Sequence, residues 1–297
     1  MYEDESPLAE QVAAQYHTDH TTRVITQEEF EEDLPLIIDA MDQPSIDGIN
    51  TWFVSKAAKE QGLKVAISGL GGDELFGGYG SFRDIPNWVR LMKIPSKVPF
   101  LGDLVRIIGE QVPEAFGIHP KAWGLIKYGG TYSGAWLLKR GLFMPWELKR
   151  VLDHELVEQG LKKLQPLKHI GETLKPLPVN SFGNVSSLES SLYMRNQLLR
   201  DADWAGMAHS IEIRLPLVDA CLLKNLAGIL AHQNEIKGKQ WLGNSPSRPL
   251  PLEIIERNKT GFTTPISEWI KDSQLSSVLL KGNQHWSRSW AQTLGRQ

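Results

Sequence analysis

The sequence has 297 residues, with 32 Lys and Arg against 35 Asp and Glu, which gives a formal net charge of -3. This near-balance, without a block of Lys or Arg, argues against a nucleic-acid binder that works through a basic surface. The single cysteine rules out an intrachain disulfide framework, and no apolar stretch approaches the length of a membrane span. Composition therefore predicts a cytoplasmic protein of one or two domains, with no nucleic-acid or membrane partner.

The first part of the chain alternates helical and strand patterns. Apolar residues at helical spacing predict three helices, over residues 7–16, 28–41 and 49–61. Short runs rich in β-branched residues predict strands at His20–Thr26 and Leu63–Ser68. This order of elements is typical of an α/β protein with parallel strands.

After Phe82 the strand patterns disappear and helical segments follow one another, with Pro and Trp between them. We expect separate amphipathic helices at Ala122–Leu142 and Pro145–Lys163, then a connector over Pro166–Phe182. The clearest helix of the sequence is expected at Ser187–Ala208.

The segment Ser68–Tyr79 reads Ser-Gly-Leu-Gly-Gly-Asp-Glu-Leu-Phe-Gly-Gly-Tyr and directly follows a predicted strand. Open α/β sheets bind ligands beyond the carboxyl ends of such strands. Glycines let backbone N–H groups approach a phosphate closely, and Asp73 or Glu74 could hold a divalent cation on it. The alternative is an ordinary glycine-rich turn whose acids lie in water or cap the next helix.

Two later segments carry unusual groups of polar residues. Charged residues are concentrated around Met207–Asp219, a segment that also contains His209. The structural explanation for this concentration is that the acids and arginines pair with one another and shape the fold. A lone histidine is more often a packing residue than a ligand or a base. The third segment, Lys259–Phe262, reads Lys-Thr-Gly-Phe, and its lysine taken alone is an ordinary solvated side chain.

In combination these segments resemble the synthetase domain of the glutamine-hydrolysing asparagine synthetase family, of which β-lactam synthetase is a close relative. The family pattern Ser-Gly-x-Gly-x-Asp-Glu-x-Phe-Gly-Gly-Tyr matches Ser68–Tyr79. Met-x-x-Ser-x-Glu-x-Arg-x-Pro-hydrophobic-x-Asp matches Met207–Asp219, and Lys-x-Gly-Phe matches Lys259–Phe262. The resemblance covers residues 1 to 275 and is specific because the three motifs occur in this order.

The resemblance implies an adenine-nucleotide α-hydrolase-like parallel sheet, truncated because its first strands are missing, followed by a mainly helical lobe. We expect a partial nucleotide-binding α/β region over residues 1–82 and the helical lobe over residues 83–297. The implied reaction activates a carboxylic acid, aspartate in the family, as an acyl-adenylate at the cost of ATP, and ammonia then attacks it.

The resemblance also assigns roles to individual residues. It implies a nucleotide site at five consecutive residues, Ser68, Gly69, Leu70, Gly71 and Gly72, with Ser68 and Gly69 at the adenosine end. Asp73 would hold Mg²⁺ on the phosphates, and Lys259 would stabilise the charge on the transferring phosphate and the departing pyrophosphate. Asp73 and Lys259 are thus the implied catalytic residues, since phosphoryl chemistry depends mainly on positioning and charge neutralisation.

Three departures from the family pattern qualify this expectation. The pyrophosphate loop Ser-Gly-Gly-x-Asp-Ser occurs nowhere in the sequence, and neither does the glutaminase domain that would supply ammonia. Leu70 stands where asparagine-forming members carry glutamate, and leucine can neither take a proton nor bind a cation. We therefore expect a C-terminal fragment with impaired activity and an acceptor acid that the sequence does not identify.

Other functions stay open at this stage. One is a different acyl-adenylate amide ligase, acting on a lactam precursor, a peptide or a sugar acid. Another is a non-catalytic interaction fragment, and the most distant is an unrelated glycine-rich phosphate binder. Because a sheet without its first strands exposes backbone edges, we also expect a homo-oligomer or an altered sheet.

Overall fold

The computed structural model describes residues 5–45, 47–109, 111, 119–230, 238–257, 265–266, 268–269 and 286–294. The chain divides into two compact units, each assembled from separate stretches of sequence. Unit 1 comprises Met1–Gly72, Arg195–Asp219 and Lys237–Gln297, and unit 2 comprises Asp73–Met194 and Ala220–Ile236. The expected division near residue 82 stays a prediction.

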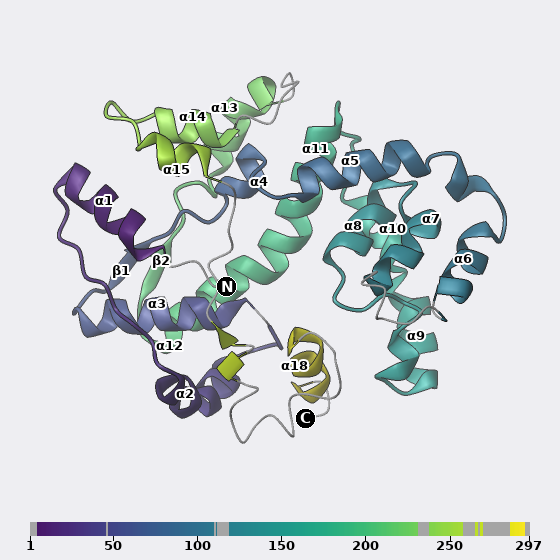
Figure 1. The fold of residues 1–297 in the computed structure, drawn as a ribbon, viewed down its shortest axis with the longest axis horizontal. Coiled ribbons are helices and arrows are strands. Elements are labelled where there is room, and N and C mark those ends of the chain that lie inside the picture. The colour runs from purple at the N-terminus through teal and green to yellow at the C-terminus, as the bar shows by residue number, and fades with distance from the viewer. Residues whose placement is uncertain are drawn as a thin grey trace. The chain divides into compact units, whose positions relative to one another are not determined.

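Unit 1 contains the short sheet and the helices around it (Figure 1). Its elements are α1 (Ser6–Tyr16), α2 (Gln27–Ala40), α3 (Gly48–Glu60), β1 (Val65–Ile67), α12 (Leu199–Ala208), β2 (Glu212–Arg214), α14 (Gly238–Asn244), α15 (Leu252–Glu256) and α18 (Trp286–Leu294). The three helices and the second strand expected before residue 68 are confirmed as α1, α2, α3 and β1.

Local sequence explains where these helices begin. Pro7 stands in the first turn of α1, where its missing N–H costs nothing. The Thr26 hydroxyl caps α2 by accepting a hydrogen bond from the Glu29 amide at 3.2 Å. Glu28 and Glu29 place negative charge in that first turn, where the helix dipole favours it.

The core of unit 1 lies where α12 packs along α3 and α2 (Figure 1). Its buried apolar side chains are Phe30, Leu34, Ile37, Ile49, Trp52, Phe53, Trp204, Ala205, Ile266 and Trp290. The helices approach closely at Gly48, where a β-carbon would come within 2.3 Å of the Trp204 ring. Only glycine therefore fits at this contact.

The sheet consists of β1 and β2, which run parallel with Val65 opposite Glu212 and Ile67 opposite Arg214. β2 was not predicted, although alternating residues at Ile211–Leu215 carried a period-two signal. Within the described residues the sheet has only these two strands, so each strand has one edge without a ladder partner. The expected parallel sheet is therefore confirmed in a reduced form, in a structure that is otherwise mostly helical.

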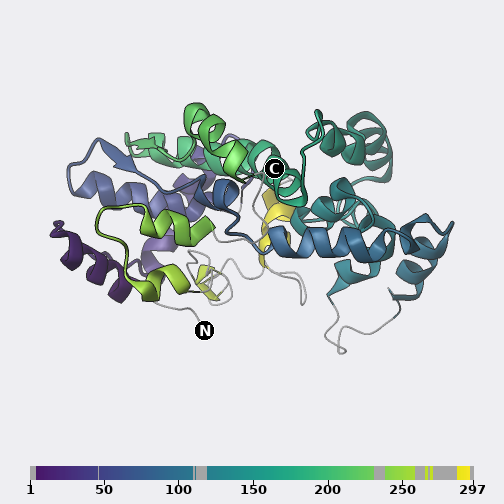
Figure 2. The ribbon, with the colours of Figure 1, turned by 90° about the horizontal axis from the view of Figure 1, so that it is seen from above.

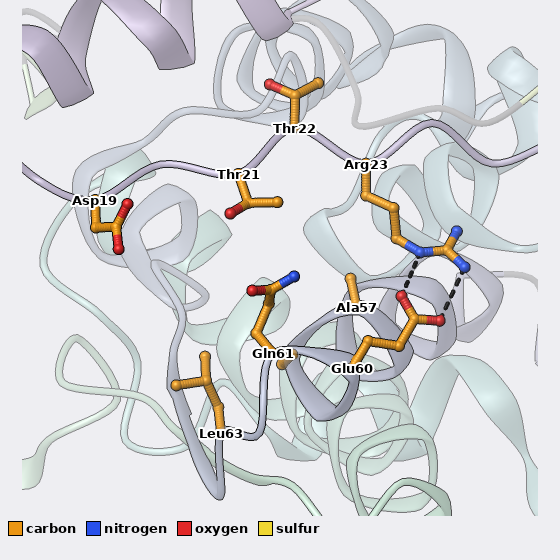
Figure 3. Close-up of a pocket in the computed structure, with 9 residues that line it drawn as sticks. Asp19, Thr21, Thr22, Arg23, Ala57, Glu60, Gln61 and Leu63 are labelled. Atoms are coloured by element: carbon orange, nitrogen blue, oxygen red, sulfur yellow. Dashed lines mark hydrogen bonds and ion pairs between the residues drawn. The ribbon is translucent and has the colours of Figure 1, made fainter.

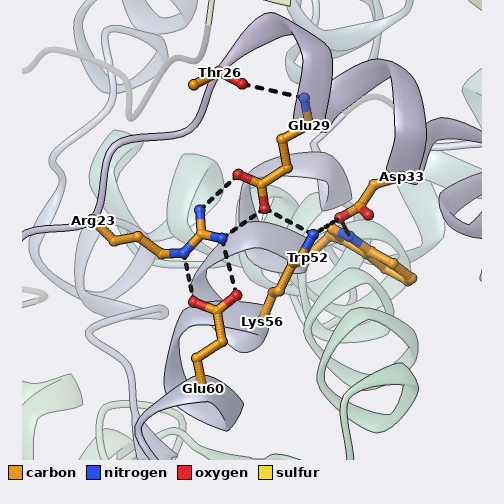
Figure 4. Close-up of polar contacts among 7 residues, drawn as sticks. All are labelled: Arg23, Thr26, Glu29, Asp33, Trp52, Lys56 and Glu60. Carbon is orange, nitrogen blue, oxygen red and sulfur yellow. Dashed lines mark hydrogen bonds and ion pairs between the residues drawn. The ribbon is translucent and has the colours of Figure 1, made fainter.

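The prediction of a strand at His20–Thr26 is wrong. Residues 18–26 form neither helix nor strand, because no neighbouring strand among the described residues supplies a ladder. Side-chain ion pairs hold this segment instead (Figure 4). The Arg23 guanidinium donates to Glu29 of α2 at 2.7 and 2.8 Å and to Glu60 of α3 at 2.6 and 2.9 Å.

Unit 2 is built from helices only, among the residues that the structure describes. They are α5 (Ser81–Met92), η1 (Pro95–Lys97), α6 (Leu101–Gly109), η3 (Pro120–Gly124), α7 (Leu125–Tyr128), α8 (Tyr132–Arg140), η4 (Leu148–Arg150), α9 (His154–Leu164), α10 (Pro166–Glu172), α11 (Ser181–Leu188) and α13 (Ala220–Leu230). α5, the long blue helix of Figure 2, packs against α8 and α11. Two further helices, α4 (Gly72–Phe76) and the π-helix η5 (Glu189–Leu198), cross the boundaries between the units along the chain.

Several helices of this region differ from the expected ones. The single helix expected over Ala122–Leu142 is interrupted after α7, and α8 starts anew with the Thr131 hydroxyl as its cap. The expected connector over Pro166–Phe182 contains α10, which starts at its proline. The helix expected over Ser187–Ala208 is helical throughout, but its middle has π geometry.

Every helix in the described part of the chain is too short or too polar to cross a lipid bilayer.

Candidate functional site

The candidate site begins at the carboxyl ends of the two parallel strands. Ser68 follows β1 directly, and its amide donates to the Arg214 carbonyl at 2.9 Å, which extends the ladder by one residue. The segment after β2, which starts at Leu215, leaves the same edge of the sheet. Two of the three sequence motifs, Ser68–Tyr79 and Met207–Asp219, therefore meet where parallel sheets bind ligands.

The first half of the loop, Ser68–Gly72, turns sharply inside unit 1. The Ser68 hydroxyl accepts a hydrogen bond from the Leu70 amide at 3.3 Å, and the Gly69 carbonyl accepts one from the Gly72 amide at 3.2 Å. Gly71 has a φ of +94°, a conformation that residues with a β-carbon rarely adopt. The glycine-rich spacing of the motif thus has a direct conformational reason.

The glycines of this turn differ in what surrounds them. A β-carbon at Gly71 would lie 2.6 Å from Val218 Cγ2, and one at Gly72 would lie 3.0 Å from Leu217 Cδ1. A β-carbon at Gly69 would meet no atom of the described residues within 4 Å. Gly71 and Gly72 therefore pack against the segment after β2, whereas the Gly69 backbone is open to a ligand.

The second half of the loop, from Asp73 to Tyr79, belongs to unit 2 and contains the two adjacent carboxylates. Asp73 is half-buried, and its carbonyl accepts hydrogen bonds from the Gly77 and Gly78 amides, both at 2.9 Å. Glu74 is 1% exposed, and its Oε1 accepts a hydrogen bond from the Tyr79 hydroxyl at 2.8 Å. Burial raises the pKa of Glu74, which favours its neutral form.

These differences distinguish Asp73 from Glu74, which the sequence left as alternative ligands for a divalent cation. A buried carboxyl whose pKa is raised, and which already accepts a hydrogen bond from a tyrosine, is a poor ligand for a divalent cation. Asp73 is therefore the better candidate for a metal ligand in this loop. Within the described ranges, no group of three or more His, Cys, Asp or Glu side chains is arranged to hold a metal ion.

The third motif, Lys259–Phe262, lies outside the described residues, so the expected proximity of Lys259 and Asp73 stays a prediction. The charges around the second motif are mainly structural. Arg214 pairs with Glu212 at 2.9 Å on the surface. Asp201 is buried, and its carboxylate accepts hydrogen bonds from Ser45 at 2.5 Å and from Trp204 at 3.0 Å.

His209 is a packing residue in this structure. It is 8% exposed, and its ring meets the Trp52 ring edge-on with 4.3 Å between the centroids. Burial lowers the pKa of His209, so the neutral form is favoured. The structural explanation that the sequence favoured is thereby supported.

Unit 1 also has an open pocket of about 480 Å³ (Figure 3). It lies between the 19–23 segment and the end of α3, and its lining residues are Asp19, Thr21, Thr22, Arg23, Ala57, Ala58, Glu60, Gln61 and Leu63. None of the residues expected to bind the nucleotide lines it. Leu63 precedes β1, so the pocket lies toward the amino end of that strand, whereas Ser68 follows its carboxyl end.

The sequence is similar to those of known proteins. The model of the asparagine synthase family matches residues 2–287. Asparagine synthetase (glutamine-hydrolyzing) 1 of Bacillus subtilis is 28% identical over 284 residues, which cover 90% of this chain and 41% of the relative. Asparagine synthetase (glutamine-hydrolyzing) 3 of the same organism is 23% identical over 297 residues, which cover 93% and 40%.

The chain therefore spans about 40% of the length of these two relatives. No solved structure gives a significant match. Because the family model covers nearly all of the sequence, the chain belongs to the asparagine synthase family.

Proposed function

We propose that this chain forms the synthetase part of an ATP-dependent amide-forming ligase, on an adenine-nucleotide α-hydrolase-like fold. The observation that carries the proposal is the contact of Gly71 with Leu217 and Val218. This contact joins residues of the two motifs that are 146 and 147 positions apart in the sequence, at the edge of the sheet where a nucleotide is expected. An ordinary glycine-rich turn would not require the second motif to lie beside it.

The proposed reaction has two steps. An oxygen of the carboxylate substrate attacks the α-phosphorus of ATP, so that a new P–O bond forms, the bond between the α- and β-phosphates breaks and pyrophosphate leaves. Ammonia then attacks the acyl carbon of the adenylate, AMP leaves, and the nitrogen loses a proton to give the amide. The protein contributes mainly by orienting these groups and neutralising their charge.

The roles in this reaction are proposed for residues of the glycine-rich loop and for Lys259, which lies outside the described residues. Open space beside Gly69 allows the adenosine end of ATP to approach the Ser68–Gly69 backbone, with Leu70, Gly71 and Gly72 continuing the turn. Asp73 would hold Mg²⁺ on the phosphates, and the metal would supply charge neutralisation there. Lys259 is proposed to stabilise the negative charge on the transferring phosphate and on pyrophosphate.

The acceptor acid is proposed to be aspartate, with ammonia supplied by a glutaminase domain. Leu70 favours a second candidate, since an apolar side chain stands in place of an ionisable one. That candidate is an acyl-adenylate ligase for another carboxylic acid, such as a lactam precursor, a peptide or a sugar acid. The two candidate functions share the nucleotide site and differ only in the carboxylic acid that serves as substrate.

Calorimetry with ATP and Mg²⁺ on the full 297-residue chain tests the nucleotide site. We expect micromolar binding that weakens by at least tenfold in Asp73→Asn. Asp39→Asn, which alters an exposed aspartate on α2, is the matched control and keeps wild-type affinity. No binding by the wild-type chain would contradict the proposal and favour a non-catalytic interaction role.

ATP–pyrophosphate exchange with a panel of carboxylic acids tests the acceptor. Because the sequence contains no Ser-Gly-Gly-x-Asp-Ser loop, we expect exchange by this chain alone to be weak. If aspartate stimulates the exchange more than the other acids do, the result supports asparagine formation. Stimulation by another acid, with aspartate inert, favours the second candidate.

A further inference from the structure

Five side chains of unit 2, two of them buried and three half-buried, form a polar cluster that the proposed chemistry does not use. They are Glu74 of α4, Tyr79 at the end of the glycine-rich loop, Arg140 at the end of α8, and Glu189 and Tyr193 of η5. Glu74 is 1% exposed and Glu189 is 0% exposed. Buried ionisable groups of this kind are costly unless each is specifically paired, so their arrangement calls for an explanation.

Arg140 is the centre of the cluster. Its guanidinium carbon lies 3.8 Å from the ring centroid of Tyr193 and 4.6 Å from that of Tyr79. Its Nε donates to Glu189 Oε2 at 2.9 Å, which neutralises the charge. Two aromatic faces and one buried carboxylate therefore fix the arginine, and the arginine in turn fixes the Tyr79 ring.

Tyr79 connects this arginine to the candidate site. Its hydroxyl donates to Glu74 Oε1 at 2.8 Å, and the other carboxyl oxygen of Glu74 has no hydrogen-bond partner among the described residues. The Ser186 hydroxyl donates to the Glu74 carbonyl at 2.9 Å, which holds the backbone of α4 from a second side. The residue next to Asp73 is thus held at both its backbone and its side chain.

Two glycines near the end of the loop, Gly77 and Gly78, also contact Asp73. The Gly77 and Gly78 amides both donate to the Asp73 carbonyl at 2.9 Å. A β-carbon at Gly78 would lie 1.7 Å from Asp73 Oδ1, so the aspartate side chain rests directly on this glycine. Tyr79 follows Gly78 in the chain, and any shift of Tyr79 would move the surface on which the Asp73 carboxylate rests.

We propose that Arg140 is a positioning residue that acts through Tyr79 to hold the Asp73–Gly78 turn and the orientation of the Asp73 carboxylate. The value of this orientation for binding Mg²⁺ with ATP rests on the proposed function. The holding of the turn by Arg140 and Tyr79 does not rest on the proposed function, and it can be measured without a nucleotide.

The test compares Arg140→Lys and Tyr79→Phe with the wild-type chain. Lysine keeps the charge but loses the planar group that lies over the Tyr79 and Tyr193 rings, and phenylalanine keeps the ring but loses the bond to Glu74. Arg83→Lys is the matched control, because Arg83 is an exposed arginine of the same unit that pairs with Asp84. Tyr79→Phe keeps the test valid if Arg140→Lys does not fold.

The first measurement is hydrogen exchange of a peptide that contains the Gly77 and Gly78 amides, on the full chain without nucleotide. Both variants are expected to exchange about tenfold faster there, while peptides of unit 2 outside the cluster and the control variant stay unchanged. Exchange equal to that of the wild type would overturn the proposal.

The second measurement is the Mg²⁺ concentration needed for ATP binding. We expect Arg140→Lys to raise it about tenfold with unchanged affinity for metal-free ATP, and to have no further effect in an Asp73→Asn background. An unchanged Mg²⁺ requirement would overturn the positioning of the carboxylate. If the wild type binds no ATP with Mg²⁺ while exchange at Gly77 and Gly78 still rises, the proposed function fails and the holding of the turn stands.

Discussion

Gly71 lies against Val218 so closely that a β-carbon on the glycine would be 2.6 Å from Val218 Cγ2. The same glycine has a φ of +94°. Backbone conformation and packing therefore both demand glycine here, at the point where the loop after β1 meets the segment after β2. This contact fixes the relation between two parts of the candidate site that are remote in sequence.

Gly71→Ala is expected to destabilise the chain by about 2–3 kcal/mol, because alanine is strained at this φ and its methyl group displaces Val218. Urea unfolding at neutral pH measures the change. Gly160→Ala is the control, since a β-carbon at Gly160 in α9 would meet no atom within 4 Å among the described residues. Alanine there is expected to stabilise by about 0.5–1 kcal/mol through helix propensity. Equal effects of the two substitutions would contradict the packing argument.

Gly69→Ala is expected to behave differently from Gly71→Ala. The added methyl group meets no atom of the part of the chain that the structure describes, so the free energy of unfolding should change by less than about 0.5 kcal/mol. If Gly69 is where the nucleotide approaches the backbone, ATP affinity should fall by about tenfold or more because the methyl group occupies that space. Calorimetry on the two variants separates binding from folding. Unchanged affinity in folded Gly69→Ala would show that the nucleotide does not approach this glycine.

Much of unit 1 could be predicted from sequence because its signals are local. Pro7 in the first turn of α1, the Thr26 cap of α2 and the periodic apolar positions define helices without knowledge of the rest of the chain. The prediction of a strand at His20–Thr26 failed because β-branched residues form a strand only where another strand supplies hydrogen bonds. Here Arg23, paired with Glu29 and Glu60, tethers the segment by its side chain instead.

The candidate site was predictable in composition but not in arrangement. The order of glycines and acids in Ser68–Tyr79 pointed to the loop, yet nothing local indicated that Glu74 is buried and Asp73 is not. Arg140 carried no signal at all, because its contacts with Tyr79 and Tyr193 join residues more than 50 positions apart. The π geometry of Glu189–Leu198 likewise has no local sequence pattern.

An exposed apolar side chain on the two-stranded sheet predicts self-association. Ile67 of β1 is 77% exposed, and within the described residues β1 pairs only with β2. We expect size-exclusion chromatography with light scattering to show a dimer or larger species. Ile67→Lys should shift it toward monomer, whereas Leu91→Lys, at an exposed leucine of α5, should not. A monomeric wild type would contradict the prediction.

The Arg23 cluster predicts a pH dependence of stability (Figure 4). Hydrogen bonds from Arg23, with Lys56 adding to them, lower the pKa of Glu29 to about 2. A carboxylate whose pKa is lower in the folded chain stabilises it at pH values above the ordinary pKa of the group. This contribution is lost as the pH falls from about 4.5 to about 2.

Glu29→Gln should therefore cost about 1–2 kcal/mol at pH 7, and its difference from wild type should shrink as the pH falls through that window. Urea midpoints at pH 7, 5, 4 and 3 measure the trend. Glu32→Gln, at an exposed glutamate of the same helix, is the control and should cost less than about 0.5 kcal/mol at pH 7. A deficit in Glu29→Gln that stays constant across the pH series would mean that the ion pairs with Arg23 do not stabilise the folded chain, because only a paired carboxylate loses its contribution on protonation.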